Sequence, residues 1–450
     1  MLQKLKYLII TFVSVFISAQ CLQAQTADSA KPSKWTNHYQ LTIISESHAG
    51  FKAPYSGRNS LADSVEVGAM TVTSTLFLGH TLWKNAAFYF NPELSGGRGL
   101  SSAVGVAGAL NGESYRVGNP EPAVFIARAY LQQHIPLGNT TYEKVEDDQN
   151  QIAGKIPTSR ITISLGKFSV SDFFDGNNYS HDPRSQFLNW SLMGNGAWDY
   201  PANTRGYTFG AVVELIKPTW AMRISSVAFP KVANSPDMAY NSKNHSETFE
   251  IEKKITVNKR PGNVRLLFSN TLSKAPSYAE GLQALATGNK DVIDYISGRE
   301  ENPNYGGKKF GIGLSADQEL TDELGVFARV GWNDGKYATW AFTEIDQTAT
   351  LGLSVKGNKW NRKDDVAGLA VVVNGLSDVH RDYLAAGGYG FIIGDGQLNY
   401  GHEAILETFY NAHVSKNLWL TLDYQFVANP AYNKDRGPVH VFGARGHIEF

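Results

Sequence analysis

The sequence predicts an all-β chain that folds as a transmembrane antiparallel β-barrel. Three observations predict it: segments of about ten residues alternate between apolar and polar side chains, the connections between them alternate in length, and an export signal comes first. An outer-membrane barrel has short periplasmic turns and long extracellular loops. We expect about 16 strands, with about 18 as the alternative.

The composition excludes several other classes of protein. The chain has 450 residues, 41 Lys plus Arg against 42 Asp plus Glu, a net charge of −1 and a mean hydropathy of −0.27. A nucleic-acid-binding protein would show a basic surface. Past the first 20 residues no apolar run is long enough for a membrane-spanning helix. Because 12% of the residues are aromatic, intrinsic disorder is also excluded.

The N-terminus has the pattern of a secretory signal peptide. Two lysines precede the apolar run 7–19, which is too short to span a bilayer as a helix. We place cleavage after Ala24, so that residues 1–24 are the leader and 25–450 the barrel domain. A lipoprotein anchored at Cys21 is the alternative. Cys21 is the only cysteine, so cleavage after Ala24 leaves a mature chain without disulfides.

Period-2 alternation recurs along the whole chain. Near the C-terminus, for example, the apolar Leu420, Leu422 and Tyr424 alternate with the polar Thr421 and Asp423. One such segment also fits a soluble β-sandwich, but repetition along the chain favours a barrel. The predicted strands are 36–46, 65–79, 85–93, 123–134, 159–170, 204–216, 219–228, 246–257, 264–273, 306–318, 324–332, 340–356, 366–375, 402–414, 418–428 and 438–450.

The connections between these segments alternate between short and long in the order expected of an outer-membrane barrel. Connections that follow even-numbered strands are mostly short, such as 217–218 and 415–417, whereas those that follow odd-numbered strands are mostly long, such as 171–203. Two connections break the rule: 136–158 is long where a turn is expected, and 333–339 is short. These exceptions leave the strand count open by two strands.

Three further features bear on the fold. A β-propeller or solenoid would show a repeated sequence period, and the chain has none. The segment 278–296 has a helical pattern, but it lies inside a long loop and is too polar to cross lipid. Phe450 ends a strand whose outward residues are apolar, which is typical of bacterial outer-membrane barrels. The chain is therefore interpreted as a single barrel domain.

The polar side of each strand must face the lumen, because the apolar side faces lipid. Guanidinium groups donate hydrogen bonds and carboxylates accept them, so a lumen of mixed sign suits polyhydroxy ligands. A ring of one sign would instead select ions. The alternative is that these groups only solvate a water-filled wall and pair with one another. The residues concerned are Arg128, Arg160, Arg223, Arg265, Arg329, Arg445, Glu250, Glu252, Glu407, Asp423 and Glu449.

Two long loops are expected to narrow the pore. The loop 171–203 is rich in aromatic side chains beside charged ones, and an aromatic face can contact the apolar face of a sugar ring. The loop 94–122 is glycine-rich, which permits a tight fold back into the barrel. A structural plug without ligand contact is the alternative for the aromatic residues. The candidate constriction residues are Arg98, Glu113, Arg116, Arg128, Arg160, Asp182, Arg184, Trp190, Trp198 and Arg445.

Three passages carry a resemblance to a known family. They are 91–133, 165–210 and 424–450, and the last contains the run Asp435-Arg436-Gly437-Pro438 before the terminal strand. In these passages the chain resembles the carbohydrate-selective porins of the OprB type, and the second passage is most similar to members from the Bacteroidetes. The resemblance implies a sixteen-stranded pore with inward-folded loops that passes monosaccharides and small oligosaccharides by diffusion.

The expected location is the outer membrane of a Gram-negative bacterium. The expected partners are small sugars, outer-membrane lipid and lipopolysaccharide, and the barrel-assembly machinery through Phe450. A homo-trimer is left open. Neither a cofactor nor a metal nor a nucleic acid is expected.

Three other functions compete with sugar-selective diffusion. A general porin without sugar preference is the nearest. An outer-membrane enzyme would need a catalytic site, but Ser180-His181-Asp182 are adjacent in sequence, which is not triad geometry, and the chain has neither HExxH nor GxSxG. A structural or adhesive barrel would have a closed lumen.

Overall fold

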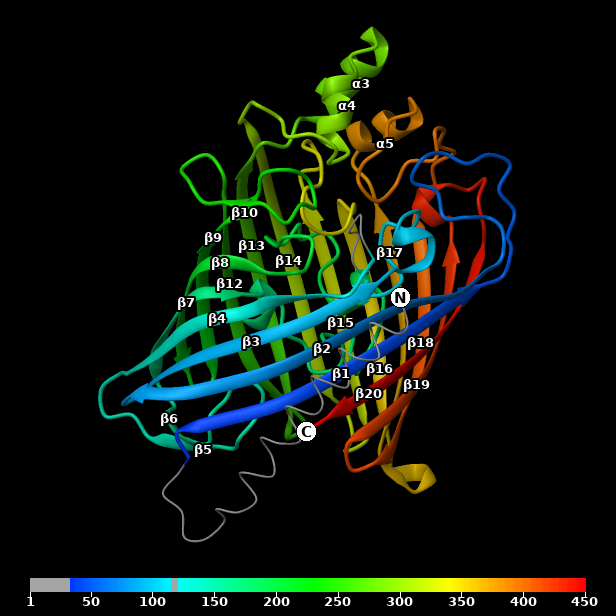
Figure 1. Ribbon diagram of the computed structural model, residues 1–450. Coiled ribbons are helices and arrows are strands. Elements are labelled where there is room, and N and C mark those ends of the chain that lie inside the picture. The colour runs from blue at the N-terminus through cyan, green and yellow to red at the C-terminus, as the bar shows by residue number, and fades with distance from the viewer. Residues whose placement is uncertain (1–32, 115–119) are drawn as a thin grey trace.

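The computed structural model describes residues 33–114 and 120–450, and these form one closed β-barrel (Figure 1). Sixteen strands follow one another around the barrel in chain order, and β1 pairs with β20 in antiparallel register to close it. The barrel strands are β1 (Trp35–His48), β2 (Glu66–Trp83), β3 (Ala86–Gly97), β4 (Ala123–Pro136), β7 (Arg160–Phe168), β8 (Thr208–Lys217), β9 (Trp220–Val227), β12 (His245–Val257), β13 (Arg260–Ser273), β14 (Gly307–Glu319), β15 (Leu324–Asn333), β16 (Gln347–Gly357), β17 (Arg362–Gly375), β18 (Glu403–Ser415), β19 (Leu418–Ala428) and β20 (Val439–Glu449). The predicted sixteen-stranded barrel is confirmed, and the alternative of 18 strands is wrong.

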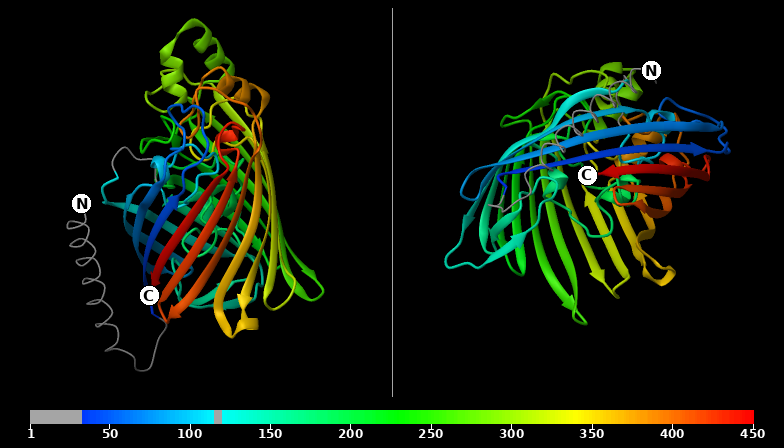
Figure 2. Two further views of the ribbon diagram at one scale, coloured as in Figure 1. Left: turned by 90° about the vertical axis from the view of Figure 1, so that its right-hand side faces the viewer. Right: turned by 60° about the horizontal axis from the view of Figure 1, so that its bottom comes forward.

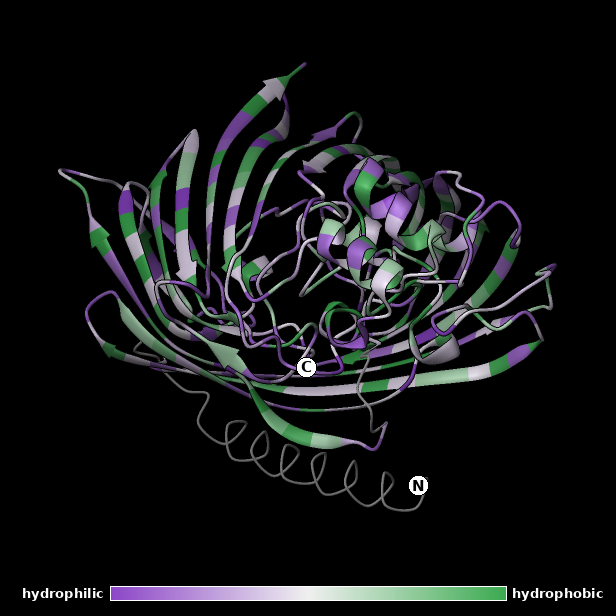
Figure 3. Ribbon diagram, turned by 90° about the horizontal axis from the view of Figure 1, so that it is seen from above, coloured by the Kyte–Doolittle hydropathy of each residue, from purple (hydrophilic) through white to green (hydrophobic). Residues whose placement is uncertain are grey.

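The strands alternate between the two faces of the barrel wall. On β19, Leu422 is 72% exposed on the outside, whereas the neighbouring Thr421 is 3% exposed and faces inward. Figure 3 shows this alternation of apolar and polar residues along many strands. Closure of the sheet satisfies the backbone of every strand, which is what the bilayer requires.

The connection 333–339, which was expected to end at a strand starting at residue 340, continues instead as a loop up to β16. β16 begins at Gln347, and the residues before it form part of a long loop. The N–H groups of Trp340, Ala341 and Phe342 all donate to the carboxylate of Asp199, at 2.9, 2.8 and 2.9 Å. Because a side chain satisfies these donors, the segment does not need a neighbouring strand. The predicted start of a strand at residue 340 is therefore wrong.

The long connection predicted at 136–158 contains a hairpin. Residues 137–159 contain β5 (Tyr142–Val145) and β6 (Gly154–Pro157), which form their own two-stranded sheet outside the barrel ladder. The hairpin lies at the end of the barrel that carries the short turns (Figure 1). An outer-membrane barrel places that end in the periplasm.

A β-bulge changes the facing of residues along β4. The register with β3 shifts between Asn91 and Pro92, which leaves Ala127 as the extra residue. Phe125, on the far side of the bulge, therefore faces the lumen, where its ring lies 6.0 Å from that of Tyr207. Simple alternation counted back from Leu131 would instead place Phe125 on the outward, apolar side. The same bulge explains why Ile126 faces lipid although it shares parity with Arg128.

The extracellular end carries a helical cap. It contains α3 (Tyr278–Thr287), α4 (Lys290–Ile296) and α5 (Asp378–Ala385), above the strand ends in both side views (Figures 1 and 2). Ser277 and Glu280 form a capping box at the start of α3. The helical pattern predicted for 278–296 is confirmed. None of the helices in the described part of the chain is long and apolar enough to cross a bilayer.

The smaller elements lie in the connections. They are η1 (Leu100–Ser102), η2 (Val170–Asp172), α2 (Trp190–Met193), β10 (Phe229–Pro230), β11 (Met238–Ala239), η3 (Asn358–Trp360) and η4 (Pro430–Tyr432). The predicted leader, residues 1–24, and Cys21 lie outside the described residues.

Candidate functional site

The loop between β7 and β8, residues 169–207, folds into the lumen. Its Phe187 ring packs against two inward-facing rings of the wall, 5.7 Å from Phe327 and 4.9 Å from Phe409. This contact explains why the apolar Phe327 shares the inward side of β15 with Arg329. The view from above shows loops filling part of the barrel interior (Figure 3). This part of loop 169–207 therefore packs against the wall at β15 and β18.

Carboxylates of the wall hold the inward loops by their backbone. Glu407 on β18 accepts the N–H groups of Leu188 at 2.5 Å and Asn189 at 3.0 Å. Glu403, four residues earlier on the same inward side of β18, accepts the N–H of Gly108 at 3.0 Å. Gly108 belongs to the β3–β4 connection, whose described residues 98–114 also fold inward. Both glutamates are buried and serve as anchors.

Two arginines of the wall hold the carbonyl groups of the same loop. Arg329 on β15 donates to the carbonyl of Leu192 at 2.8 Å, and Arg445 on β20 donates to those of Pro183 and Gln186 at 2.7 Å each. Arg445 is 2% exposed. Alternation predicted correctly that both side chains point inward. The structure places Arg445 beneath the loop, where it does not line the cavity described below.

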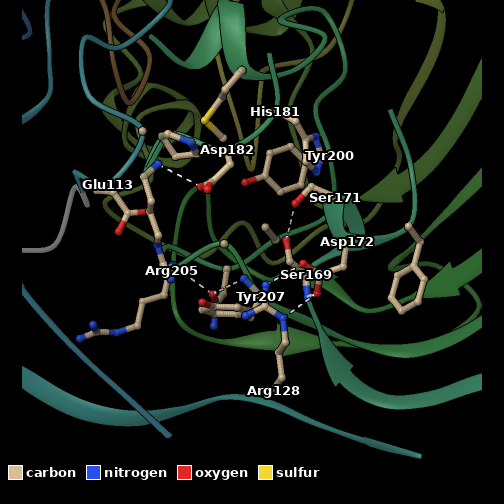
Figure 4. Close-up of a pocket in the computed structure, with 18 of the residues that line it drawn as sticks. Glu113, Arg128, Ser169, Ser171, Asp172, His181, Asp182, Tyr200, Arg205 and Tyr207 are labelled. Carbon is tan, nitrogen blue, oxygen red and sulfur yellow. Dashed lines mark hydrogen bonds and ion pairs between the residues drawn. The ribbon is translucent and has the colours of Figure 1, made fainter. Parts of the chain in front are cut away.

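The anchored loops leave a polar cavity of about 510 Å³ between them and the barrel wall at β1, β2, β4 and β8 (Figure 4). Its volume is in the range of small-molecule sites, about 300–1,000 Å³. The charged residues that line it have both signs. They are Arg128, Arg184, Arg205, Glu113, Asp172, Asp182 and Glu214. Five predicted constriction residues line this cavity, namely Glu113, Arg128, Asp182, Arg184 and Trp190.

Arg184 is the central charged group of the cavity. Its guanidinium lies 3.1 Å from Glu93 of β3 and 3.2 Å from Glu113 of the β3–β4 connection. It also donates to the side-chain oxygen of Gln40 on β1 at 2.6 Å. Burial by itself disfavours the charge, but Glu113 and Glu93 raise the pKa of Arg184 well above its usual value. One guanidinium thus joins two inward loops to two strands.

A second ion pair lies across the cavity. Arg128 of β4 makes two hydrogen bonds to the carboxylate of Asp172, at 2.7 and 2.6 Å. Its guanidinium also lies 5.4 Å from the ring centre of Tyr207, whose hydroxyl donates to Glu93 at 3.0 Å. This two-point pairing fixes the plane of the guanidinium.

Trp190 connects the aromatic and the charged parts of the cavity. Its indole N–H donates to the carbonyl of Asn111 at 2.9 Å, and its ring stacks on Phe342 at 4.9 Å with 14° between the planes. The stacking fixes the orientation of the indole, which lines the cavity. Tyr200, which also packs on Phe342 at 4.4 Å, extends this aromatic group.

The remaining predicted residues lie elsewhere. Arg160 lines a second cavity near the periplasmic end, and Arg98 is exposed. Trp198 is buried, with its ring 6.3 Å from Phe174. Arg116 lies outside the described residues. The structure therefore brings together only part of the predicted set.

Several residues of the cavity were not among the predicted ones. Gln40, on the inward side of β1, lines the cavity, and Glu93, on the inward side of β3, is buried beside it as a partner of Arg184. Strand parity could have found both. Asp172, Arg205 and Tyr207 come from loop 169–207. No local pattern marks these three, because the fold of the loop decides which of its side chains reach the cavity.

The adjacent Ser180, His181 and Asp182 do not form a catalytic triad. The hydroxyl of Ser180 donates to the carbonyl of Leu192 at 2.5 Å. The carboxylate of Asp182 accepts from the backbone N–H of Arg184 at 2.9 Å and from Ser185 at 2.9 Å. In residues 33–114 and 120–450, no three His, Cys, Asp or Glu side chains are grouped so that they could hold a metal ion.

Comparisons with known proteins agree with this geometry. Residues 75–450 match the model of a family described as carbohydrate-selective porin, OprB family. No curated protein sequence matches the chain.

Similar structures are found among solved outer-membrane channels. The high-pH structure of OprB from Pseudomonas putida superposes with a TM-score of 0.66 at 16% identity, covering 93% of this chain and 94% of that one. The low-pH structure of the same protein gives 0.47 at 14% identity, covering 93% of each chain. The outer-membrane channel DcaP of Acinetobacter baumannii gives 0.49 at 10% identity, covering 94% of this chain and all (100%) of the other. The match at 0.66 supports the sixteen-stranded porin fold.

The family model spans most of the sequence, and the closed barrel of this chain is the fold expected of a porin. The family is one of non-enzymatic channels in the outer membrane of Gram-negative bacteria. The chain belongs to the OprB family of carbohydrate-selective outer-membrane porins.

Proposed function

We propose that the cavity around Arg184 and Glu113 is the constriction through which small sugars diffuse passively into the periplasm. One observation carries this proposal. Glu113 pairs with Arg184 through Oε1, while its second oxygen, Oε2, is buried and accepts no hydrogen bond from any described residue. A buried acceptor without a donor costs free energy, and a sugar hydroxyl can supply that donor.

The charges around the cavity favour an uncharged solute. Arg128 and Arg184 are each paired with a carboxylate, so neither sign dominates the field inside the constriction. A mixed lining offers both donors and acceptors to hydroxyl groups. The indole of Trp190 adds an aromatic surface at the same level of the pore. These groups could replace the water shell of a pyranose.

Liposome swelling tests the proposal. Vesicles that contain the purified barrel are diluted into glucose, into a larger sugar, or into a zwitterionic amino acid of similar size. We expect faster swelling with glucose than with the amino acid. Equal rates would instead show the alternative, a general porin. In the same assay Glu113→Gln, which keeps the size of the side chain, should reduce the glucose rate and leave the amino acid rate unchanged.

The outer face supports proposals about partners. Exposed apolar side chains such as Leu351 and Leu422 support contact with outer-membrane lipid and lipopolysaccharide. Phe450 exchanges backbone hydrogen bonds with Tyr39 at 2.9 and 3.1 Å, beside the seam where the barrel closes, which supports its recognition by the barrel-assembly machinery. Deletion of Phe450 should then lower the amount of folded barrel in the membrane.

Two finer proposals concern assembly and origin. A homo-trimer stays a prediction, and the mass of the barrel in a native lipid particle tests it, because a monomer would contradict it. The resemblance of the passage 165–210 to members from the Bacteroidetes supports an origin in that group.

A further inference from the structure

The hairpin 137–159 is held inside the periplasmic end of the barrel by contacts to three strands. At its tip, Asn150 accepts a hydrogen bond from Asn91 of β3 at 2.9 Å. The side chain of Gln149 donates to Glu449 of β20 at 2.9 Å, and Asp147 lies 3.6 Å from His38 of β1. A turn that only connects two strands would make none of these contacts. The tip therefore occupies a defined place against the lumen wall.

The hairpin and the wall enclose a second cavity. It has a volume of about 630 Å³ and lies between hairpin residues 150–156 and the inner faces of β3, β4, β7, β8 and β9. The first cavity, at the loop constriction, also reaches the hairpin tip. Three residues line both cavities: Gln132 of β4, Glu214 of β8 and Asn150 of the tip. These three residues mark the place where one cavity continues into the other.

The second cavity has the mixed lining of the first. Arg160 donates to the carbonyl of Pro157 at 2.7 Å, while its Nε is buried and has no hydrogen-bond partner among the described residues. His134 bonds to Thr162 at 2.9 Å. The ring of Tyr89 adds an aromatic surface to the lining. An unpaired donor beside an aromatic ring is suited to a hydroxyl-bearing ring compound.

We propose that the hairpin 137–159 forms a second filter, in which Asn150, Gln132 and Glu214 make a periplasmic neck and the cavity beyond them is an exit subsite for small sugars. This inference rests on the proposed function, since a sugar reaches the neck only after it passes the loop constriction. The hairpin then limits the length of the solute, because a second sugar ring must enter the neck while the first occupies the exit subsite.

Two hairpin variants test the filter in liposome swelling and in single-channel recordings. Asn150→Gly removes the amide at a position with φ of 53°, which glycine adopts without strain. The second variant replaces residues 147–152 by two glycines and removes the whole tip. Lys144→Ala is the matched control, because this exposed hairpin residue lines neither cavity. Heat-modifiable migration in gels verifies that each barrel is folded.

We expect both variants to raise the swelling rate with a disaccharide several-fold, to change the glucose rate by less than twofold, and to increase ion conductance. The control should match the wild type. If folded barrels without the tip keep the wild-type size limit and conductance, the filter is overturned while the proposed function stands. If the wild type already fails to prefer glucose over the amino acid, the proposed function fails, whatever the hairpin variants do.

Discussion

Glu407 accepts the backbone N–H of Leu188 at 2.5 Å, although the two residues lie 219 positions apart in the sequence. The carboxylate belongs to the wall of the barrel, and the N–H belongs to loop 169–207. This side chain is one of the wall groups that fix how far the loop projects into the lumen. Arg445 of the wall also binds carbonyl groups of the same loop. The position of the loop, and with it the width of the pore, therefore depends on side chains of the wall.

Glu407→Ala should widen the pore. Its two hydrogen bonds to the loop contribute roughly 2 kcal/mol to the local stability of the loop. Their loss should increase single-channel conductance and admit larger sugars. Glu407→Gln keeps an acceptor and should be intermediate, while Asp322→Ala, at an exposed turn, should leave conductance unchanged. An unaltered conductance in folded Glu407→Ala would show that the loop holds its position without this anchor.

Arg184→Ala should make the channel prefer cations. The guanidinium is the common partner of Glu93 and Glu113, and its removal leaves two carboxylates without their countercharge. We expect the permeability ratio of potassium to chloride to rise by at least about twofold, because the local field becomes negative. Reversal potentials in a salt gradient measure this ratio. Arg381→Ala in the extracellular cap is the control, and a ratio equal to that of the wild type would contradict the assignment of Arg184 to the constriction.

Trp190→Ala should weaken sugar binding more than Trp190→Phe. The alanine variant loses the aromatic surface, which corresponds to about 1.4 kcal/mol or a tenfold change in affinity. The phenylalanine variant loses mainly the hydrogen bond to Asn111. The concentration of glucose that halves the ion current reports the affinity. If both variants bind glucose like the wild type, Trp190 has only a packing role.

Sugar selectivity should not change between about pH 7 and pH 5. Burial by itself raises the pKa of Asp182, but Arg184 and the hydrogen bonds to the carboxylate outweigh this effect and lower it below its usual value. The attraction between Asp182 and Arg184 is therefore complete above the ordinary pKa of about 3.9 and is lost as the pH falls through the lowered pKa. Swelling assays across this range test the prediction. Asp182→Asn should remove the change at acidic pH, and a loss of selectivity already at about pH 5 would contradict it.

Most of the barrel could be predicted from the sequence. Lipid selects an apolar side chain and the lumen a polar one at every second residue, so each strand carries its own signal, as Thr421 and Leu422 do. The alternation of apolar and polar residues gave the wrong prediction where the hydrogen-bonded pairing of neighbouring strands is interrupted. At the bulge beside Ala127 the facing of Phe125 reverses, and before β16 the N–H groups of Trp340 and its neighbours bond to Asp199 instead of to a strand.

The lining of the cavity could be predicted only in part. Alternation placed Arg128 and Arg445 inside the barrel with equal weight, yet Arg128 lines the cavity and Arg445 lies beneath loop 169–207. The difference arises from the loop, which covers one part of the lumen and leaves another open. In the same way, Trp190 lines the cavity while Trp198 of the same loop is buried.

The sequence by itself determined the barrel and the facing of most strands, because both follow from contacts with lipid, water or the next strand, and it left the strand count open by two. Only the tertiary structure decided which inward groups remain open to a solute. Hydrogen bonds such as that between Glu407 and Leu188 join residues that are far apart in the chain, and no local pattern encodes them.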